Sequence, residues 1–168
     1  MPIELLAAAP ADATTIAALR IRVAERLTER YGAGHWSNAG TIASVNHALR
    51  HGGLFVARRQ AQVIATLILT SRKPWAIDPQ YFTPTRRVLY LTSMAVEPAL
   101  QGKGIGRACL AAALEIARAR GAEFIRLDAY DAAAGAGGFY AECGYREVRR
   151  VTYRKTPLIY YERAVPVP

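Results

Sequence analysis

The stretch Leu89-Tyr-Leu-Thr-Ser-Met-Ala-Val-Glu-Pro-Ala-Leu-Gln-Gly-Lys-Gly-Ile-Gly-Arg107 carries the strongest structural signal in the chain. Residues 88–96 are rich in β-branched, aromatic and aliphatic side chains, which is typical of a largely buried strand. Pro98 lacks a backbone N–H and closes that strand. The three glycines within 102–106 allow a sharp turn, because no Cβ restricts their backbone. The stretch therefore predicts a strand, a glycine-rich turn and then a helix.

The helix predicted after this turn gives the junction a chemical use. Apolar residues recur at helical spacing over 105–120, and Gly121 ends the pattern. The first amides of a helix lack partners within it and carry partial positive charge, and here Lys103 and Arg107 add full charges. The junction therefore predicts a phosphate-binding turn. It is neither the dinucleotide fingerprint, since Cys109 replaces the required glycine or alanine, nor a P-loop, which needs Gly-Lys-Ser/Thr.

Length and composition favour a folded globular protein with a single domain over residues 1–168. Of these residues, 52% are hydrophobic and 9% aromatic. No apolar run reaches the length of a membrane span, and Met1-Pro-Ile-Glu4 lacks the basic start of a secretory signal. Two cysteines, Cys109 and Cys143, are too few for a disulfide framework. We expect a cytoplasmic protein without a membrane partner.

The formal charge of +9, from 22 Lys and Arg against 13 Asp and Glu, favours anionic partners. The basic residues are scattered in short pairs rather than gathered in one tail or helix. A nucleic-acid-binding protein is one hypothesis, but the chain lacks the aromatic–basic interleaving of known readers, and we expect no nucleic acid partner. No third ligand accompanies His47 and His51, so we also expect no metal site.

The rest of the chain alternates between predicted strands and helices. We expect a strand over 3–8, then a helix to about Arg30 with Asp12 as its N-cap, and a second helix over 41–49. A hairpin follows, with strands over 54–58 and 63–70 and a turn at Gln60. Further along we expect a strand over 124–130, a short helix starting near Gly137, and a closing pair of strands over 145–153 and 158–163 with Pro157 at its turn.

Two segments outside the regular pattern are rich in aromatic residues. The loop over 31–37 contains His35 and Trp36 beside two glycines. The segment over 71–87 contains three prolines together with Trp75, Tyr81 and Phe82. Such long connections are usually functional or disordered, and the aromatic residues favour an ordered segment here. We expect His35, Trp36, Trp75 and Tyr81 to bind substrate, although each could equally be a packing residue.

Gln101-Gly102-Lys103-Gly104-Ile105-Gly106, after a strand ending Val96-Glu97-Pro98, resembles the acetyl-CoA-binding motif of the GNAT superfamily of N-acetyltransferases. Phe139-Tyr140, followed after three residues by Gly144-Tyr145, resembles the second motif of that family. The resemblance implies an α+β fold with a mixed, mostly antiparallel central sheet. Helices flank that sheet, which is splayed at its central strand to admit CoA.

The resemblance also implies acetyl-CoA as co-substrate. The strand before the turn would pair with the pantetheine arm, and the amides of the turn would hold the pyrophosphate. Asp131 departs from the asparagine that many members carry at its position. The implied contacts to acetyl-CoA are Met94, Ala95, Val96, Gln101, Gly102, Lys103, Gly104, Ile105, Gly106, Arg107 and Asp131.

The implied activity is transfer of an acetyl group from acetyl-CoA to a primary amine of a small molecule or peptide, by direct attack on the thioester. An alkylammonium has a pKa of about 10, so a base must remove its proton. We expect Glu97 to be that base, with Tyr90, Asp128 or a water relay as competitors. Tyr140 would protonate the departing thiolate, and an amide near 94–96 would bind the carbonyl oxygen. The alternatives are a catalytically inactive CoA-binding regulatory module and a nucleic-acid-binding protein. Many members of the family form dimers, so the resemblance also allows a homodimer.

Overall fold

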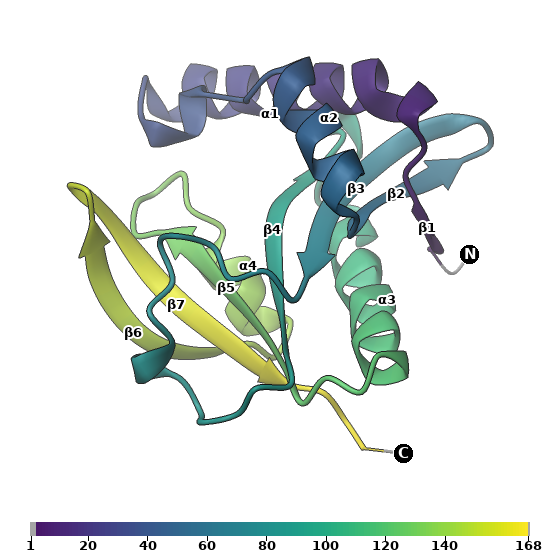
Figure 1. The fold of residues 1–168 in the computed structure, drawn as a ribbon. Coiled ribbons are helices and arrows are strands. Elements are labelled where there is room, and N and C mark those ends of the chain that lie inside the picture. The colour runs from purple at the N-terminus through teal and green to yellow at the C-terminus, as the bar shows by residue number, and fades with distance from the viewer. Residues whose placement is uncertain (1–2, 168) are drawn as a thin grey trace. The chain divides into compact units, whose positions relative to one another are not determined.

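The computed structural model describes residues 3–167, and Figure 1 shows an α+β fold. Seven strands follow the order β1-β2-β3-β4-β5-β7-β6, and only β4 and β5 are recorded as a parallel pair. This confirms the predicted fold class. The strands are β1 (Leu5–Ala7), β2 (Leu54–Arg59), β3 (Gln62–Thr70), β4 (Val88–Val96), β5 (Phe124–Tyr130), β6 (Arg146–Tyr153) and β7 (Thr156–Ala164). The α-helices are α1 (Ala13–Tyr31), α2 (Ile42–His51), α3 (Ile105–Ala119) and α4 (Gly137–Glu142).

By internal contacts the chain divides into two compact units. The first unit comprises Met1–Leu69 and Ser93–Ala113, and the second comprises Thr70–Thr92 and Leu114–Pro168. The boundaries fall inside β4 and inside α3, so each unit holds part of both elements. That residues 1–168 form one domain stays a prediction.

The first unit is held together by helices packed on strands. One apolar cluster joins α1, through the fully buried Ile16 and Leu19, with Val45 of α2 and Val56 of β2. Figure 1 shows α1 and α2 lying against each other over this part of the sheet. Ala95 of β4 belongs to the same cluster, so the helices and the second half of β4 share one core.

The second unit contains the segment over 71–87, which is ordered by its aromatic residues as predicted. Phe82 stacks on Tyr160 of β7, with 5.2 Å between ring centroids. Glu162, with only 2% of its side chain exposed, accepts a hydrogen bond from the Thr83 hydroxyl at 2.5 Å and forms an ion pair with Arg146 at 2.5 Å. A buried carboxylate needs such partners, because an unpaired charge in an apolar interior is costly.

One local prediction is confirmed in position only, and another is wrong. Asp12 is the N-cap residue of α1, as predicted, but its carboxylate makes no capping hydrogen bond to that helix; it accepts hydrogen bonds from the Ala9 amide at 2.8 Å and from Arg58 at 2.5 Å. Pro157 is not in the final turn but in β7. The turn is made by Arg154 and Lys155, whose positive φ values of 46° and 68° suit a two-residue hairpin.

Several predicted boundaries are confirmed. β4 and β5 have the predicted bounds, α4 begins at Gly137, and Gln60 turns the β2–β3 hairpin with φ of 55°. Helix α2 extends two residues beyond the predicted end, to His51. None of the helices among the described residues is both long and apolar enough to cross a membrane.

Candidate functional site

The turn between β4 and α3 has the backbone that the sequence predicted. Gly102 and Gly104 have φ values of 72° and 80°, in the left-handed region that favours glycine. A Cβ built at either position would meet nothing within 4 Å, so conformation rather than crowding requires the glycines. Both glycines and Lys103 between them are exposed. The turn therefore exposes a lysine between two left-handed glycines, and we call residues Gly102–Gly106 the cradle.

The donors of this cradle come from the start of α3. The first backbone bond of the helix runs from the Ala108 amide to the Gly104 carbonyl at 3.0 Å, so the amides of Ile105 and Gly106 lack a partner within the helix. Gln101, a predicted contact of acetyl-CoA, is hydrogen-bonded within the chain itself. Its amide donates to the Pro98 carbonyl at 3.3 Å, and its side-chain Nε2 donates to the Val96 carbonyl at 3.1 Å. Gln101 braces the cradle against the end of β4.

Strand β4 changes direction just before the cradle. Ser93 has φ of 51°, a left-handed conformation that interrupts regular strand geometry and re-aims the following peptide groups. The parallel pairing of β4 with β5 is recorded over Val88–Tyr90 and Phe124–Arg126, while both strands continue beyond it. The predicted binding residues Met94, Ala95 and Val96 follow the irregularity. That the strands splay there to admit a ligand stays a prediction.

Glu97, the predicted base, is engaged in an ion pair. Its Oε2 accepts a hydrogen bond from Arg22 Nη2 at 2.6 Å, and Arg22 Nε lies 3.2–3.3 Å from both carboxylate oxygens. The hydrogen bond with Glu97 is the main cause that raises the pKa of Arg22. Sequence reasoning could not have found this pair, because 75 positions separate the two residues. Both carboxylate oxygens of Glu97 therefore already act as hydrogen-bond acceptors for Arg22.

Tyr140, the predicted acid, lies buried in a group of aromatic rings. Its ring meets that of Tyr145 edge-on, with 5.7 Å between centroids, and lies 6.2 Å from that of Tyr161. Burial, and to a smaller extent the charges of Asp128 and Cys143, hold the pKa of Tyr140 well above its ordinary value. The hydroxyl therefore keeps its proton at neutral pH, as a proton donor must.

Asp128, named above only as a competitor, has the chemistry of a base. Burial raises the pKa of its carboxyl, and its charge in turn contributes to the raised pKa values of Tyr130, Tyr140 and Tyr160. In the β5–β7 ladder Asp128 lies opposite Tyr160. A carboxylate that binds its proton more tightly than usual is a stronger base, and such groups gather at functional sites.

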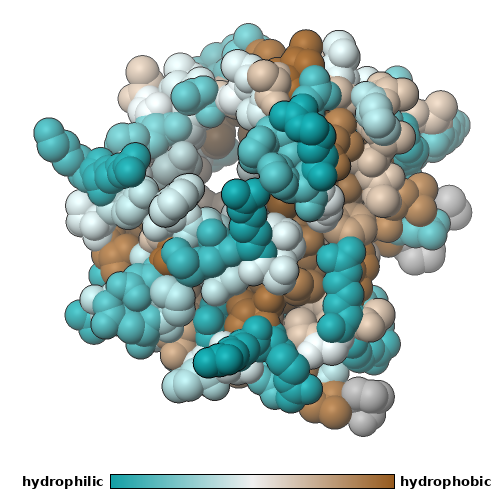
Figure 2. All heavy atoms as spheres, in the orientation of Figure 1, coloured by the Kyte–Doolittle hydropathy of each residue, from teal (hydrophilic) through white to brown (hydrophobic). Residues whose placement is uncertain are grey.

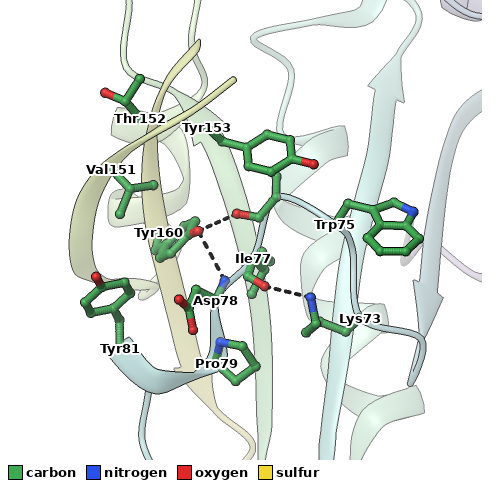
Figure 3. A pocket seen from close by; sticks show the side chains of 11 residues that line it. Lys73, Trp75, Ile77, Asp78, Pro79, Tyr81, Val151, Thr152, Tyr153 and Tyr160 are labelled. Carbon is green, nitrogen blue, oxygen red and sulfur yellow. Dashed lines mark hydrogen bonds between the residues drawn. The ribbon is translucent and has the colours of Figure 1, made fainter. Parts of the chain in front are cut away.

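Two of the predicted substrate residues line one cavity, which Figure 3 shows from close by. The cavity has a volume of about 440 Å³. The Tyr160 hydroxyl supports its wall by donating to the Ala76 carbonyl and accepting from the Asp78 amide at 3.2 Å. Lys73 Nζ donates to the Ile77 carbonyl at 2.9 Å. The cavity is lined by Lys73, Trp75, Ala76, Ile77, Asp78, Pro79, Tyr81, Val151, Thr152, Tyr153 and Tyr160.

The other two predicted substrate residues, His35 and Trp36, do not line that cavity. They form a short 3-10 turn, η2 (His35–Ser37), after α1. Trp36 Nε1 donates to the Gly32 carbonyl at 2.9 Å, and the Ser37 and Thr28 hydroxyls lie 2.7 Å apart. The tryptophan therefore stabilises its own loop. Trp75, in contrast, is 89% exposed at the cavity mouth.

Asp131 lies beside a second cavity, of about 540 Å³, at the start of α4. Its carboxylate forms an ion pair with Arg150 at 3.2 Å, and Arg150 also binds Glu147 at 2.8 Å. The glycines here have a packing reason that the sequence did not reveal. A Cβ at Gly135 would lie 1.9 Å from the Tyr130 carbonyl oxygen, and one at Gly137 would lie 2.6 Å from the Tyr161 hydroxyl.

Among the described residues no three His, Cys, Asp or Glu side chains gather as metal ligands would. Burial raises the pKa of the Cys109 thiol to about 11, so this thiol is a poor nucleophile at neutral pH.

On the face in Figure 2, hydrophilic side chains lie in separate groups with hydrophobic residues between them.

Comparison with known protein families shows which family this chain is similar to. The sequence profile of the Acetyltransferase (GNAT) family matches residues 20–145. No curated protein matches the chain in sequence.

Solved structures share the fold at low sequence identity. A GNAT-family acetyltransferase from Listeria monocytogenes is 17% identical, with a TM-score of 0.74 over 96% of this chain and 94% of that one. A ribosomal-protein-alanine N-acetyltransferase from Brucella melitensis is 18% identical, with a TM-score of 0.70 over 95% and 98%. The acetyltransferase yncA from Salmonella typhimurium, solved with acetyl-CoA, is 16% identical, with a TM-score of 0.65 over 99% and 95%.

Proposed function

The chain belongs to the acetyltransferase (GNAT) family, and from that premise we propose that it transfers an acetyl group from acetyl-CoA to a primary amine of a small molecule or peptide. The cradle at Gly102–Gly106 carries the proposal. Its left-handed glycines, exposed Lys103 and the first amides of α3 form an open site of the charge and geometry that a diphosphate needs. The similar yncA structure was solved with acetyl-CoA, which supports the same ligand here.

The chain's own residues divide the remaining work. Acetyl-CoA supplies the thioester, and attack by the acceptor amine breaks its C–S bond. Tyr140 keeps its proton because burial raises its pKa, and it donates that proton to the sulfur. An amide after the irregularity at Ser93, within Met94–Val96, stabilises the carbonyl oxygen. The raised pKa of Cys109 argues against transfer through that thiol and in favour of direct attack.

Two carboxylates compete for the role of base. Glu97 remains a candidate at the end of β4, but its oxygens already accept hydrogen bonds from Arg22. Asp128 is favoured because burial makes it more basic and because it lies opposite Tyr160, which lines the 440 Å³ cavity. Side chains along a strand alternate between the two faces of the sheet, so Asp128 lies on the same face of the sheet as the other even-numbered residues of β5.

The cavity lined by Trp75 and Tyr81 is the proposed acceptor pocket in the second unit. Its aromatic walls suit an apolar body, and its volume of about 440 Å³ suits a small molecule or a short peptide segment. His35 and Trp36, which belong to the first unit and do not line this cavity, remain proposed substrate-binding residues. Asp131 is proposed to orient the cofactor from the start of α4, in competition with its ion pair to Arg150.

The test is a binding measurement followed by a turnover measurement. We expect acetyl-CoA to raise the melting temperature, and a panel of primary amines to release CoA thiol in the presence of acetyl-CoA. The matched control for binding is Gly104→Val, since a β-branched residue is poorly tolerated at φ of 80°. Binding without release for any amine would favour the alternative, a catalytically inactive CoA-binding regulatory module. No melting shift with acetyl-CoA would overturn the proposal.

A further inference from the structure

Arg20 occupies an unexpected place on α1. The core-facing stripe of this helix includes Ile16 and Ala17, which are buried, and Val23, which packs against the same apolar cluster. Position 20 is four residues after Ile16 and three before Val23, so it lies in the middle of the same stripe. An arginine therefore stands where the pattern of the helix calls for an apolar side chain.

The Arg20 side chain is half-buried, and two nitrogens of its guanidinium are shielded from solvent without hydrogen-bond partners in the described part of the chain. Its Nε and Nη2 are buried and have no hydrogen-bond partner among the described residues. Burial alone lowers its pKa, without an opposing contribution from a carboxylate. Other arginines of this unit differ: Arg22 binds Glu97 at 2.6 Å, and Arg58 binds Asp12 at 2.5 Å.

An unpaired buried charge is unfavourable for folding, since the lost hydration is not replaced. The guanidinium presents several N–H donors in a planar fork that matches a carboxylate. A bound anion would restore the missing hydrogen bonds. The orphaned donors of Arg20 therefore point to a ligand that brings its own negative charge.

The surroundings of Arg20 indicate which ligand this is. Ile16, its neighbour on the stripe, belongs to the same apolar cluster as Ala95, and Val23 packs against that cluster. Ala95 lies in the segment of β4 that we propose to face the thioester carbonyl. The diphosphate of acetyl-CoA already has a proposed site in the cradle. We therefore assign the anion that Arg20 would bind to the other substrate, the acceptor.

We propose that Arg20 binds the carboxylate of the acceptor, so that the acceptor class is an amino carboxylic acid, either a free amino acid or a small peptide. This inference rests on the proposed function. It assigns Arg20 to substrate recognition, with a bidentate contact to the carboxylate while the amine is presented to the thioester.

The experiment compares acceptors that differ only in the carboxylate. Amino acids, their primary amides and their decarboxylated amines are assayed with wild type, Arg20→Met, Arg20→Lys and the control Arg26→Met. Arg26 is exposed on the same helix, 3.9 Å from Glu29. We expect kcat/KM of Arg20→Met to fall by about 10- to 100-fold for amino acids and by less than about 2-fold for amides. Arg20→Lys should fall between, because it keeps the charge and loses the fork.

A second measurement needs no turnover. We expect Arg20→Met to raise the melting temperature of the ligand-free protein, because it removes an unpaired buried charge. Amino acids should raise the melting temperature of wild type and of Arg26→Met, but not of Arg20→Met. A higher melting temperature without any loss of discrimination would mean that water satisfies Arg20, and would overturn the inference.

The two proposals fail in different ways. Equal turnover of acids and amides by wild type and Arg20→Met would remove the role of Arg20 while leaving the acetyltransferase intact. Conversely, a carboxylate-dependent melting shift that is lost in Arg20→Met, without acetylation of any amine, would keep the anion site and remove the proposed function. If Arg20→Met does not fold, Arg20→Lys provides the same comparison.

Discussion

Asp128 shows how burial alone gives one carboxyl group a distinct chemistry. Burial raises its pKa, so the folded protein holds a proton on Asp128 more tightly than the unfolded chain does. The ionised form is therefore unfavourable for folding at pH values above its ordinary pKa of 3.8. A residue kept at such a cost to stability is a candidate for function, because strain and buried charge gather at active sites.

We expect Asp128→Asn to lower kcat by about 100-fold or more, since the amide cannot accept the proton of the amine. The same substitution should raise the melting temperature at pH 7. The gain should shrink as pH falls through the folded-state pKa and vanish below about pH 3.8, where the wild-type carboxyl is neutral in both states. Glu97→Gln is the matched variant. If Glu97→Gln abolishes turnover and Asp128→Asn does not, Glu97 is the base.

Tyr140 is tested by removing only its hydroxyl. We expect Tyr140→Phe to lower kcat by about 100-fold, because the thiolate then leaves without a proton. The loss should persist across the neutral range, since the raised pKa keeps the wild-type hydroxyl protonated there. The control is Tyr145→Phe, whose buried hydroxyl has no hydrogen-bond partner among the described residues. Full activity of Tyr140→Phe over the whole pH range would exclude it as the acid.

At the scale of elements, the start of α4 combines weak helix propensity with strict packing. Three glycines, 135, 137 and 138, disfavour a helix there by their conformational freedom. Two of them are required by close approach: Gly135 to the Tyr130 carbonyl and Gly137 to the Tyr161 hydroxyl. The backbone at the start of α4 therefore lies so close to β5 and β7 that a Cβ would not fit at either glycine.

Gly135 and Gly138 should respond differently to alanine. We expect Gly135→Ala to destabilise the protein by about 1–3 kcal/mol, because its Cβ would lie 1.9 Å from a backbone oxygen. Gly138→Ala should instead stabilise it by about 0.5–1 kcal/mol, since a Cβ there meets nothing within 4 Å inside α4. Urea denaturation measures both changes. Equal effects of the two substitutions would contradict the packing argument.

At the scale of the whole molecule, the two compact units share continuous elements. The boundary between the units falls after Thr92 in β4 and after Ala113 in α3. Separating the units would break a strand and a helix in their middle, and both elements would lose cooperative hydrogen bonds. This connectivity supports the prediction that residues 1–168 form one domain.

We therefore expect a single unfolding transition. Calorimetry should give one peak, and the calorimetric enthalpy should equal the van't Hoff enthalpy, as in two-state unfolding. Acetyl-CoA should shift the whole peak upward, because a ligand that binds only the folded state stabilises everything that unfolds with its site. Two separate peaks, of which acetyl-CoA moves only one, would show that the units unfold independently.

The sequence by itself determined the central elements and the cradle. Residues 88–96 and 124–130 have strong β patterns, and glycines at 102 and 104 leave few alternatives to a turn with positive φ, so these features follow from local physics. Local signals placed Asp12 at the N-cap of α1 but did not reveal that its carboxylate binds Arg58. They misplaced Pro157, because Arg154 and Lys155 form the turn with positive φ values.

Only the tertiary structure decided what surrounds each functional group. It paired Glu97 with Arg22, buried Asp128 and Tyr140, gathered Trp75 and Tyr81 around one cavity, and left two buried nitrogens of Arg20 without hydrogen-bond partners among the residues described. The physical reason is that backbone conformation depends on neighbours in the chain. Desolvation and charge pairing depend instead on residues brought together from positions far apart.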